Sequence, residues 1–303
     1  MEIHLFSLEY LPELQRLINQ HISTVFPGWG VSATAIERHL QRNSHQPIID
    51  PWVTERKTWA AFEQGRLVAA AHLLRYGTDD PVGEHYRGVC DIAWLLADSE
   101  HTTQAAALLH AGIEHAKTWG STQLIAWDSH LPTPMIFGIP DVWSHLIQVF
   151  AQEGFEPMPS RREALYGGWI RDLPPPGTPP IHGLTLKRSV GRIWGTRFTA
   201  WLDGEEIAFC ECSTDLSEGG EVPSLRGWGL LGELYTHDAY RSRGVGRWLI
   251  ESMAAWMRMA GCDRIVLSCA EEDEQAGAGR FYQRLGWEIF TRLQDGWHLK
   301  TRP

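Results

Sequence analysis

A turn rich in glycine and arginine is the strongest chemical signal in the sequence. It reads Arg241-Ser242-Arg243-Gly244-Val245-Gly246 and lies between an apolar, strand-like segment, 230–236, and a segment with helical periodicity, 245–260. Glycine allows a tight backbone turn, and the N–H groups at a helix N-terminus attract anions. The pattern therefore indicates a cradle for a phosphate or pyrophosphate, although an ordinary strand-to-helix turn with solvated arginines would look the same.

A second signal is a tyrosine on the helix that we predict after the next strand. The run is Ala278-Gly279-Arg280-Phe281-Tyr282-Gln283-Arg284-Leu285-Gly286-Trp287. A phenol, whose ordinary pKa is about 10, can donate a proton to a departing thiolate. Tyr282 lies near the beginning of this helix, where its hydroxyl could face a groove. The alternative is a core tyrosine whose hydroxyl is satisfied within the fold.

Two residues on the strand before the turn could accept a proton. Glu233 and His237 are four positions apart, so strand alternation places them with Tyr235 on one face. An amine attacks only when it is neutral, and a base can take its proton directly or through water. Glu233 could instead form a strand-end ion pair, and His237 could cap the backbone of the turn. Burial would make Glu233 a more efficient base, because it raises a carboxyl pKa.

Two further clusters have simple structural explanations. The run Glu271-Glu272-Asp273-Glu274 could attract a cationic amine, but we favour an acidic first helical turn that compensates the helix dipole. Cys210 and Cys212 have no second Cys or His pair nearby at zinc-finger spacing. Ordinary thiols on a strand are therefore favoured there, and we expect no bound metal.

The elements that must position these residues occur twice. A strand, a glycine turn and a strand at 59–71 return at 198–210, with their glycines 139 positions apart. A helical pattern at 105–120 returns at 245–260, and each copy continues into a short apolar strand and a second helix that ends in Gly-aromatic. This order predicts an α/β (α+β) protein with two tandem domains, each a twisted mixed sheet flanked by helices.

A proline-rich stretch separates the two copies. Five prolines fall within 174–180, which favours an extended spacer. We predict a first domain at 1–172, a linker at 173–181 and a second domain at 182–303. About fifty residues precede Trp59 in the first copy, enough for helices at 11–22 and 33–40, whereas the second copy lacks an equivalent segment.

Charge and composition exclude several classes of protein. The 303 residues have a formal net charge of −10, most of it before residue 174, which argues against a nucleic-acid partner. No apolar run approaches the roughly 18 residues of a membrane-spanning helix, and the chain start does not resemble a signal peptide. Five cysteines cannot all pair within the chain. We therefore expect a cytoplasmic protein with reduced thiols and no membrane partner.

Taken in order, the motifs of the second half resemble the GNAT superfamily of acetyl-CoA-dependent N-acetyltransferases. The likeness runs from Phe198 to Trp287: a hairpin, a strand, R-x-x-G-x-G, a helix, a strand and A-x-x-F-Y-x-x-x-G-aromatic. The first half resembles the family only in its layout. Because the second half lacks the two helices that wall the acceptor site in this family, we expect the first half or the loop 213–227 to supply that wall.

The resemblance implies a role for each motif. Backbone amides of 241–247 would hold the pyrophosphate of coenzyme A, and the strand at 234–236 would splay to bind the pantetheine. A backbone N–H of that strand would polarise the acetyl carbonyl. Tyr282 would protonate the departing thiolate, and Glu233 lies where many members carry a basic carboxylate. The coenzyme-binding residues so implied are Leu234, Tyr235, Thr236, Arg241, Ser242, Arg243, Gly244, Val245, Gly246 and Arg247.

Setting the halves against each other predicts a division of labour. At an offset of 140, residues 241–246 face 101–106, which contain neither glycine nor arginine. At the second helix, alignment of Gly286-Trp287 with Gly154-Phe155 places Tyr282 opposite Phe150. We expect the first half to be a degenerate copy. The second half would transfer an acetyl group from acetyl-CoA to a primary amine of a small molecule. The alternatives are acetylation of a protein or peptide amine, a non-catalytic acyl-CoA-binding regulator, and an interaction protein with no ligand.

Overall fold

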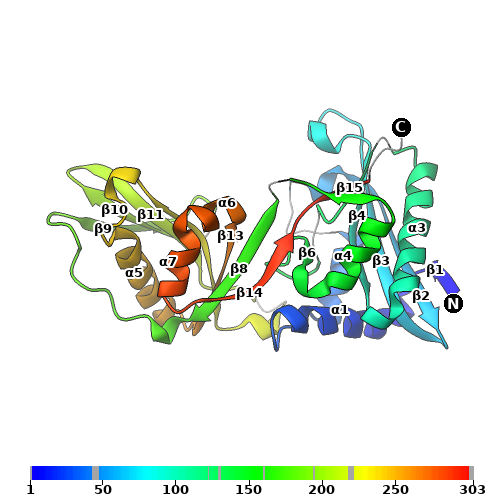
Figure 1. Ribbon diagram of the computed structural model, residues 1–303, viewed down its shortest axis with the longest axis horizontal. Helices are drawn as coiled ribbons and strands as arrows, with labels where there is room; N and C mark the ends of the chain where they lie inside the picture. The colour runs from blue at the N-terminus through cyan, green and yellow to red at the C-terminus, as the bar shows by residue number, and fades with distance from the viewer. Residues whose placement is uncertain are drawn as a thin grey trace. The chain divides into compact units, whose positions relative to one another are not determined.

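A computed structural model describes residues 2–42, 48–121, 123–128, 131–159, 161–193, 195–217 and 222–299. The chain forms two compact units (Figure 1). Unit 1 comprises Met1–Glu163 and Thr291–Pro303, and unit 2 comprises Ala164–Phe290. Each unit is a mixed sheet with helices, which confirms the predicted fold class.

Unit 1 has the strand order β1-β2-β3-β4-β5-β15-β7. Strands β1 to β4 are antiparallel, β4 and β5 are parallel, and β15 is antiparallel to both of its neighbours. The strands are β1 (Glu2–Leu5), β2 (Val53–Glu63), β3 (Arg66–Tyr76), β4 (Val89–Ala97), β5 (Gln123–Ala126), β7 (Phe155–Pro157) and β15 (Trp297–Leu299). The short strand β6 (Ile139–Pro140) pairs with the end of β14.

The helices of unit 1 follow the predicted apolar periodicity. They are α1 (Leu11–Val25), α2 (Ala33–Gln41), α3 (Thr102–Thr118) and α4 (Ser144–Gln152). Helix α1 buries one face, which includes Leu14, Ile18 and Ile22, as expected for an amphipathic helix on a sheet. The two helices expected before Trp59 are therefore confirmed.

Unit 2 has the strand order β14-β8-β13-β12-β11-β10-β9. Its strands are β8 (Arg162–Trp169), β9 (Thr185–Val190), β10 (Thr196–Leu202), β11 (Glu205–Ser213), β12 (Trp228–Thr236), β13 (Arg264–Ala270) and β14 (Glu288–Gln294). Its helices are α5 (Val245–Met259), α6 (Glu271–Asp273) and α7 (Gly279–Arg284), with a π-helical turn, η10 (Glu274–Ala278), between the last two. The described residues between β8 and β10 contain no α-helix, as expected for the shortened second copy.

The two units exchange their last strands along the chain. Strand β8 follows β7 in sequence but lies between β13 and β14 in unit 2, and β15 follows β14 but lies between β5 and β7 in unit 1. Figure 1 shows the green strand β8 in one sheet and the red strand β15 in the other. The units thus differ from the predicted domains of 1–172 and 182–303. This correction arises because composition marks the proline-rich segment, whereas strand pairing decides which residues form a compact unit.

The proline-rich segment belongs to unit 2 and lies along α5. The indole Nε1 of Trp248 donates to the carbonyl of Gly177 at 3.1 Å, and Arg258 Nη2 donates to the carbonyl of Ile170 at 2.6 Å. A Cβ placed on Gly244 would lie 3.3 Å from Pro180 Cβ. The segment therefore packs on the unit that follows it.

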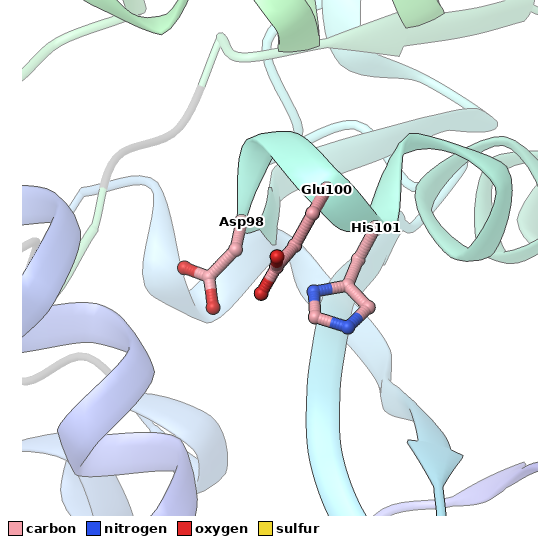
Figure 2. A group of neighbouring side chains, drawn as sticks. All are labelled: Asp98, Glu100 and His101. Atoms are coloured by element: carbon pink, nitrogen blue, oxygen red, sulfur yellow. The ribbon is translucent and has the colours of Figure 1, made fainter.

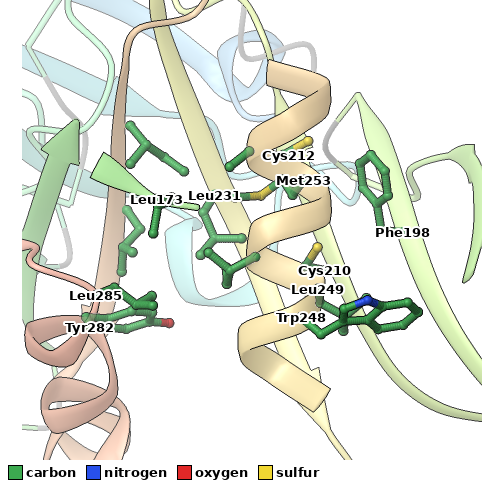
Figure 3. Packing of buried hydrophobic residues seen from close by; sticks show 14 of the residues in the cluster. Leu173, Phe198, Cys210, Cys212, Leu231, Trp248, Leu249, Met253, Tyr282 and Leu285 are labelled. Atoms are coloured by element: carbon green, nitrogen blue, oxygen red, sulfur yellow. The ribbon is translucent and has the colours of Figure 1, made fainter. Parts of the chain in front are cut away.

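One face of the unit 2 sheet and helices α5 and α7 enclose the core of this unit (Figure 3). Cys210 and Cys212 are buried in this core and point from the same face of β11. Burial raises the pKa of both thiols, so they stay protonated at neutral pH. The predicted strand with ordinary thiols is confirmed. No helix among the described residues is long and apolar enough to span a membrane.

Candidate active site

Strand β12 separates from β13 halfway along its length. The two strands pair in parallel only from Trp228 to Leu230, whereas β12 stays paired with β11 as far as Thr236. Gly232 is an extra residue on β12, since Glu233 lies opposite Glu211 and Leu231 opposite Cys212. A β-bulge bends the strand that contains it. The bulge therefore accounts for an opening between the carboxyl-terminal ends of β12 and β13.

The residues of β12 beside this opening alternate between two faces. Leu234 packs against the core that contains α5 and α7, whereas Glu233, Tyr235 and His237 are exposed on the opposite face. Glu233 thus lacks the burial that would make it a more efficient base. His237 Nδ1 accepts a hydrogen bond of 3.3 Å from the Ala239 amide, which is the capping role that we weighed against a catalytic one.

The turn after β12 has the geometry of an anion cradle. A 3₁₀ turn, η9 (Asp238–Tyr240), leads into residues 241–244, and α5 begins at Val245. Ser242 and Gly244 have φ angles of 60° and 84°. This left-handed conformation suits glycine and costs about 1–2 kcal/mol at Ser242. No side chain caps α5, so the amides of its first turn point outward without a helical partner.

Two of the three arginines around the turn, Arg241 and Arg247, lie close to carboxylates. Arg241 Nε donates to the Thr236 carbonyl at 3.1 Å and lies 3.1 Å from Asp238 Oδ1. Arg247 Nε lies 2.8 Å from Glu251 Oε1. The Arg241 and Arg247 side chains are more than half exposed. Their guanidinium groups can therefore add positive charge to the anion field of the helix start.

Gly246 marks the place where three elements meet. A Cβ on this residue would lie 3.6 Å from Thr236 Oγ1 and 3.8 Å from Phe281 Cζ, both ordinary contact distances. The first turn of α5 therefore lies against the end of β12 and the start of α7. Gly244 needs its backbone freedom, whereas Gly246 has a helical conformation and only keeps the approach to the turn open.

Tyr282 is a core residue with an unpartnered hydroxyl. Its ring is 7% exposed and stacks on Trp287 at 5.6 Å between centroids. Figure 3 shows the hydroxyl directed away from α7. Among the described residues, the Tyr282 hydroxyl has no hydrogen-bond partner. Burial, followed by the nearby Cys269 and Asp273, raises the pKa of Tyr282 above its usual value, so this phenol keeps its proton at neutral pH.

Tyr282 and Glu233 lie on opposite sides of the unit 2 sheet. Tyr282 belongs to the core on the α5 side, and Glu233 is exposed on the other side. The edge of β12 that is unpaired with β13 beyond Leu230 lies between these two faces. The acidic run lies beside this region: residues 271–273 form the first helical turn, as favoured from the sequence, and Asp273 acts electrostatically on Tyr282.

Unit 1 has a different arrangement at the equivalent helix start. Its α3 begins directly after η4 (Ser99–His101), without a four-residue turn like 241–244. Asp98, Glu100 and His101 gather there, with potential ligand atoms within 4.8 Å of one another (Figure 2). His101 Nε2 lies 3.4 Å from Glu63 Oε2. This helix start therefore presents carboxylates where unit 2 presents arginines.

A second tyrosine, Tyr166, lies near the Tyr282 ring and was not among the predicted site residues. Tyr166 of β8 is fully buried in unit 2, with its ring 5.3 Å from that of Tyr282. It falls within the predicted first domain, 1–172, and no local motif surrounds it. Its place beside Tyr282 follows from the pairing of β8 with β13 and β14, which local sequence patterns do not predict.

Comparisons with known proteins agree with this geometry. Residues 164–287 match the Acetyltransferase (GNAT) family, a range that nearly coincides with unit 2. An aminoglycoside N(6')-acetyltransferase type 1 of Stenotrophomonas maltophilia is 32% identical over 125 residues, which cover 39% of this chain and 75% of that protein. The chain therefore belongs to the GNAT family of acetyltransferases. It is an acetyl-CoA-dependent acyltransferase that acts on an amine.

Solved structures with the same fold span both halves. A tandem GNAT protein from the clavulanic acid biosynthesis pathway has a TM-score of 0.61 at 14% identity, over 100% of this chain and 99% of that one. A GCN5-related N-acetyltransferase from Sphaerobacter thermophilus has a TM-score of 0.62 at 15% identity, over 100% and 96%. At these identities the likeness concerns the fold alone, and it supports two GNAT-like domains in tandem.

The residues of unit 2 fit acetyl-CoA, the cosubstrate of the family. The uncapped start of α5 offers N–H donors for a pyrophosphate. Beyond Leu230, the edge of β12 that no longer pairs with β13 offers backbone groups for an extended amide chain. The Tyr282 hydroxyl adds a proton donor within the core of the same unit.

Proposed function

We propose that unit 2 transfers the acetyl group of acetyl-CoA to a primary amine of a small, cationic molecule, and that unit 1 does not bind the coenzyme. The observation that carries this proposal is the opening between β12 and β13. It has an uncapped helix start at one end, a protonated tyrosine on one face and an exposed carboxylate on the other.

In this proposal each group has one task. Acetyl-CoA supplies the acetyl group as an activated thioester. Amides of 244–247 and the arginines at 241, 243 and 247 bind the pyrophosphate, while Leu234, Tyr235 and Thr236 orient the pantetheine along β12. A β12 N–H polarises the acetyl carbonyl. Glu233 accepts the amine proton, directly or through water, and Tyr282 gives a proton to the departing sulfur.

The acceptor side supports a cationic substrate. Glu233 is exposed there next to Tyr235, whose ring is 43% exposed and lies 5.6 Å from that of Phe209. Carboxylates and aromatic faces both attract ammonium groups. The relative is an aminoglycoside N(6')-acetyltransferase, which favours an aminoglycoside-like amine as the substrate here. Residues 218–221 of the loop expected to wall this side lie outside the described residues.

The arrangement of unit 1 supports a structural role for that unit. The start of its helix α3 lacks a turn like 241–244, and the carboxylates of Asp98 and Glu100 would repel a pyrophosphate. Phe150, fully buried on α4, stands where unit 2 has Tyr282 and has no proton to give. We therefore assign coenzyme binding and chemistry to unit 2 alone.

Two measurements on the whole chain test the proposal. Calorimetric titration with coenzyme A should give one site per chain. Release of free thiol from acetyl-CoA with a panel of aminoglycosides and polyamines should depend on the amine and fall about 10²–10⁴-fold in Tyr282→Phe. Absence of coenzyme binding would overturn the proposal. Binding without amine-dependent thiol release would favour the regulator, and a substrate restricted to peptide amines would correct the acceptor class.

A further inference from the structure

Strand β8 places Tyr166 within the site of unit 2. Its hydroxyl donates a 2.7 Å hydrogen bond to Glu274 Oε1, and its ring lies 5.3 Å from that of Tyr282. Tyr166 has no exposed surface. The bond is part-buried, since Glu274 is half-exposed, but a hydrogen bond to a carboxylate is among the stronger ones in proteins, so this contact holds Glu274 against the sheet.

Glu274 begins the irregular segment that sets the position of α7. The π-helical turn Glu274–Ala278 contains a break at Gly277, where φ is 127°, and α7 starts immediately afterwards. Such turns are weak points in a helix, because their hydrogen bonding departs from the α pattern. The placement of α7 therefore depends on what anchors the segment before it.

Gly279 shows how closely Tyr166 is fitted to this segment. A Cβ on Gly279 would lie 2.9 Å from the Tyr166 hydroxyl and 2.7 Å from Glu274 Cγ. Only glycine leaves room for the hydroxyl and the carboxylate to meet at the first residue of α7. Tyr282 follows three positions later, on the next turn of the same helix.

We propose that Tyr166 is a positioning residue for Tyr282, acting through Glu274 and the start of α7. This inference rests on the proposed role of Tyr282 as proton donor. Its consequence is that the predicted first domain, 1–172, contributes to the chemistry of unit 2, because the exchanged strand β8 carries the residue that orients the acid.

Tyr166→Phe tests the proposal by removing one hydroxyl and keeping the ring. We expect kcat to fall at least about 10-fold, because small displacements of a reacting group are costly, while KM for acetyl-CoA stays within about twofold. Tyr86→Phe is the matched control, since the Tyr86 hydroxyl donates to the Asp128 carboxylate in unit 1 at 2.5 Å. It should leave kcat unchanged.

The other partner of the bond supplies a second pair of variants. Glu274→Gln keeps a carbonyl oxygen that can accept from Tyr166 and should retain most of the activity, whereas Glu274→Ala should match Tyr166→Phe. This pair keeps the test decisive even if Tyr166→Phe does not fold. Equal activity of the Gln and Ala variants would overturn the proposal.

Two further measurements separate positioning from a merely structural role. In a Tyr282→Phe background, Tyr166→Phe should cause no additional loss of kcat, because its effect passes through the Tyr282 hydroxyl. Without any coenzyme, amide hydrogen exchange in 279–285 should be faster in Tyr166→Phe than in wild type or Tyr86→Phe. Additive losses, or unchanged exchange in 279–285, would count against the proposal.

The outcomes also distinguish this proposal from the proposed function. If Tyr282→Phe keeps full activity, the acid assignment fails. If Tyr282→Phe loses activity but Tyr166→Phe and Glu274→Ala do not, the acid assignment stands and the positioning role is wrong.

Discussion

At the scale of single residues, burial separates the two groups proposed to move protons. Tyr282 is enclosed by Trp287 and Tyr166, and its pKa is raised, so it holds its proton until a basic group such as a thiolate forms beside it. Glu233 is exposed, and its proposed role as base rests on its position on β12 beyond the last residue that pairs with β13. The loss of activity on replacing each residue should therefore depend on pH in a different way.

Glu233→Gln should cost most at neutral pH. An alkyl amine is mostly protonated there, so removing the base slows attack, and the loss should shrink as pH rises toward about 10 and the amine deprotonates by itself. The loss in Tyr282→Phe should stay constant from pH 7 to about pH 9, because the raised pKa keeps Tyr282 protonated throughout. Rate profiles of both variants with one amine test this. A loss in Glu233→Gln that is constant with pH would exclude Glu233 as the base.

His72 should make unit 1 sensitive to acid. It is buried with Nδ1 2.8 Å from Thr58 Oγ1, and burial lowers its pKa from 6.5 to about 3. The folded state therefore prefers the neutral ring, and stability should fall as pH drops from about 6.5 toward 3, by up to about 1.4 kcal/mol per pH unit. Urea unfolding of unit 1 at several pH values measures this slope. His72→Phe should flatten it, and an unchanged slope would contradict the assignment.

At the scale of elements, the two helices that follow the central strands begin differently. Helix α5 starts after a turn with two left-handed residues, Ser242 and Gly244, and has no cap. Helix α3 starts directly after a 3₁₀ turn and has carboxylates beside it. The same periodic pattern thus gives one helix start suited to an anion and one that repels it.

Gly246→Asp should abolish coenzyme A binding with little change in stability. The Cβ of the new side chain would meet Thr236 and Phe281 at ordinary contact distances, so we expect the fold to tolerate it. Its negative charge at the start of α5 would repel the pyrophosphate of coenzyme A. Thr103→Asp is the matched control, because Thr103 is exposed at the second position of α3. Calorimetric titration compares the two. Loss of binding in Thr103→Asp alone would reverse the choice of active unit.

Gln104 is unsuitable as such a control. Its side chain is buried and Nε2 donates to Glu63 Oε1 at 3.2 Å, so an aspartate there would place two carboxylates together. The sequence alignment at an offset of 140 pairs residue 106 with Gly246, whereas the helix starts pair Thr103 with it. The two alignments therefore differ by three positions at this helix start.

At the scale of the whole molecule, the exchange of β8 and β15 makes each unit depend on the other half of the chain. Trp297 of β15 is 3% exposed and pairs with β5 on one side and β7 on the other. Without β15 these two strands would have no common partner. Separate expression of residues 182–303 would likewise omit β8 from unit 2.

A chain that ends at Asp295 should lose stability in unit 1 and keep it in unit 2. Removing β15 leaves the facing edges of β5 and β7 unpaired and exposes the residues that the buried Trp297 ring covers. Proteolysis with mapping of the fragments should show cleavage within residues 1–163 first. A chain that ends at Leu299 is the control and should resist cleavage like the full chain. Equal resistance of both chains would show that β15 contributes nothing to unit 1.

Local patterns in the sequence determined the elements, the repeat, the turn rich in glycine and arginine and the position of Tyr282 on its helix. Helical period, strand alternation and glycine-rich turns are properties of neighbouring residues. Only the tertiary structure decided that β8 and β15 change partners, that Tyr166 reaches Glu274, and that Glu233 is exposed. These depend on pairing and packing between distant segments. A three-residue strand such as β15 is too short for its sequence pattern to predict which strands it pairs with.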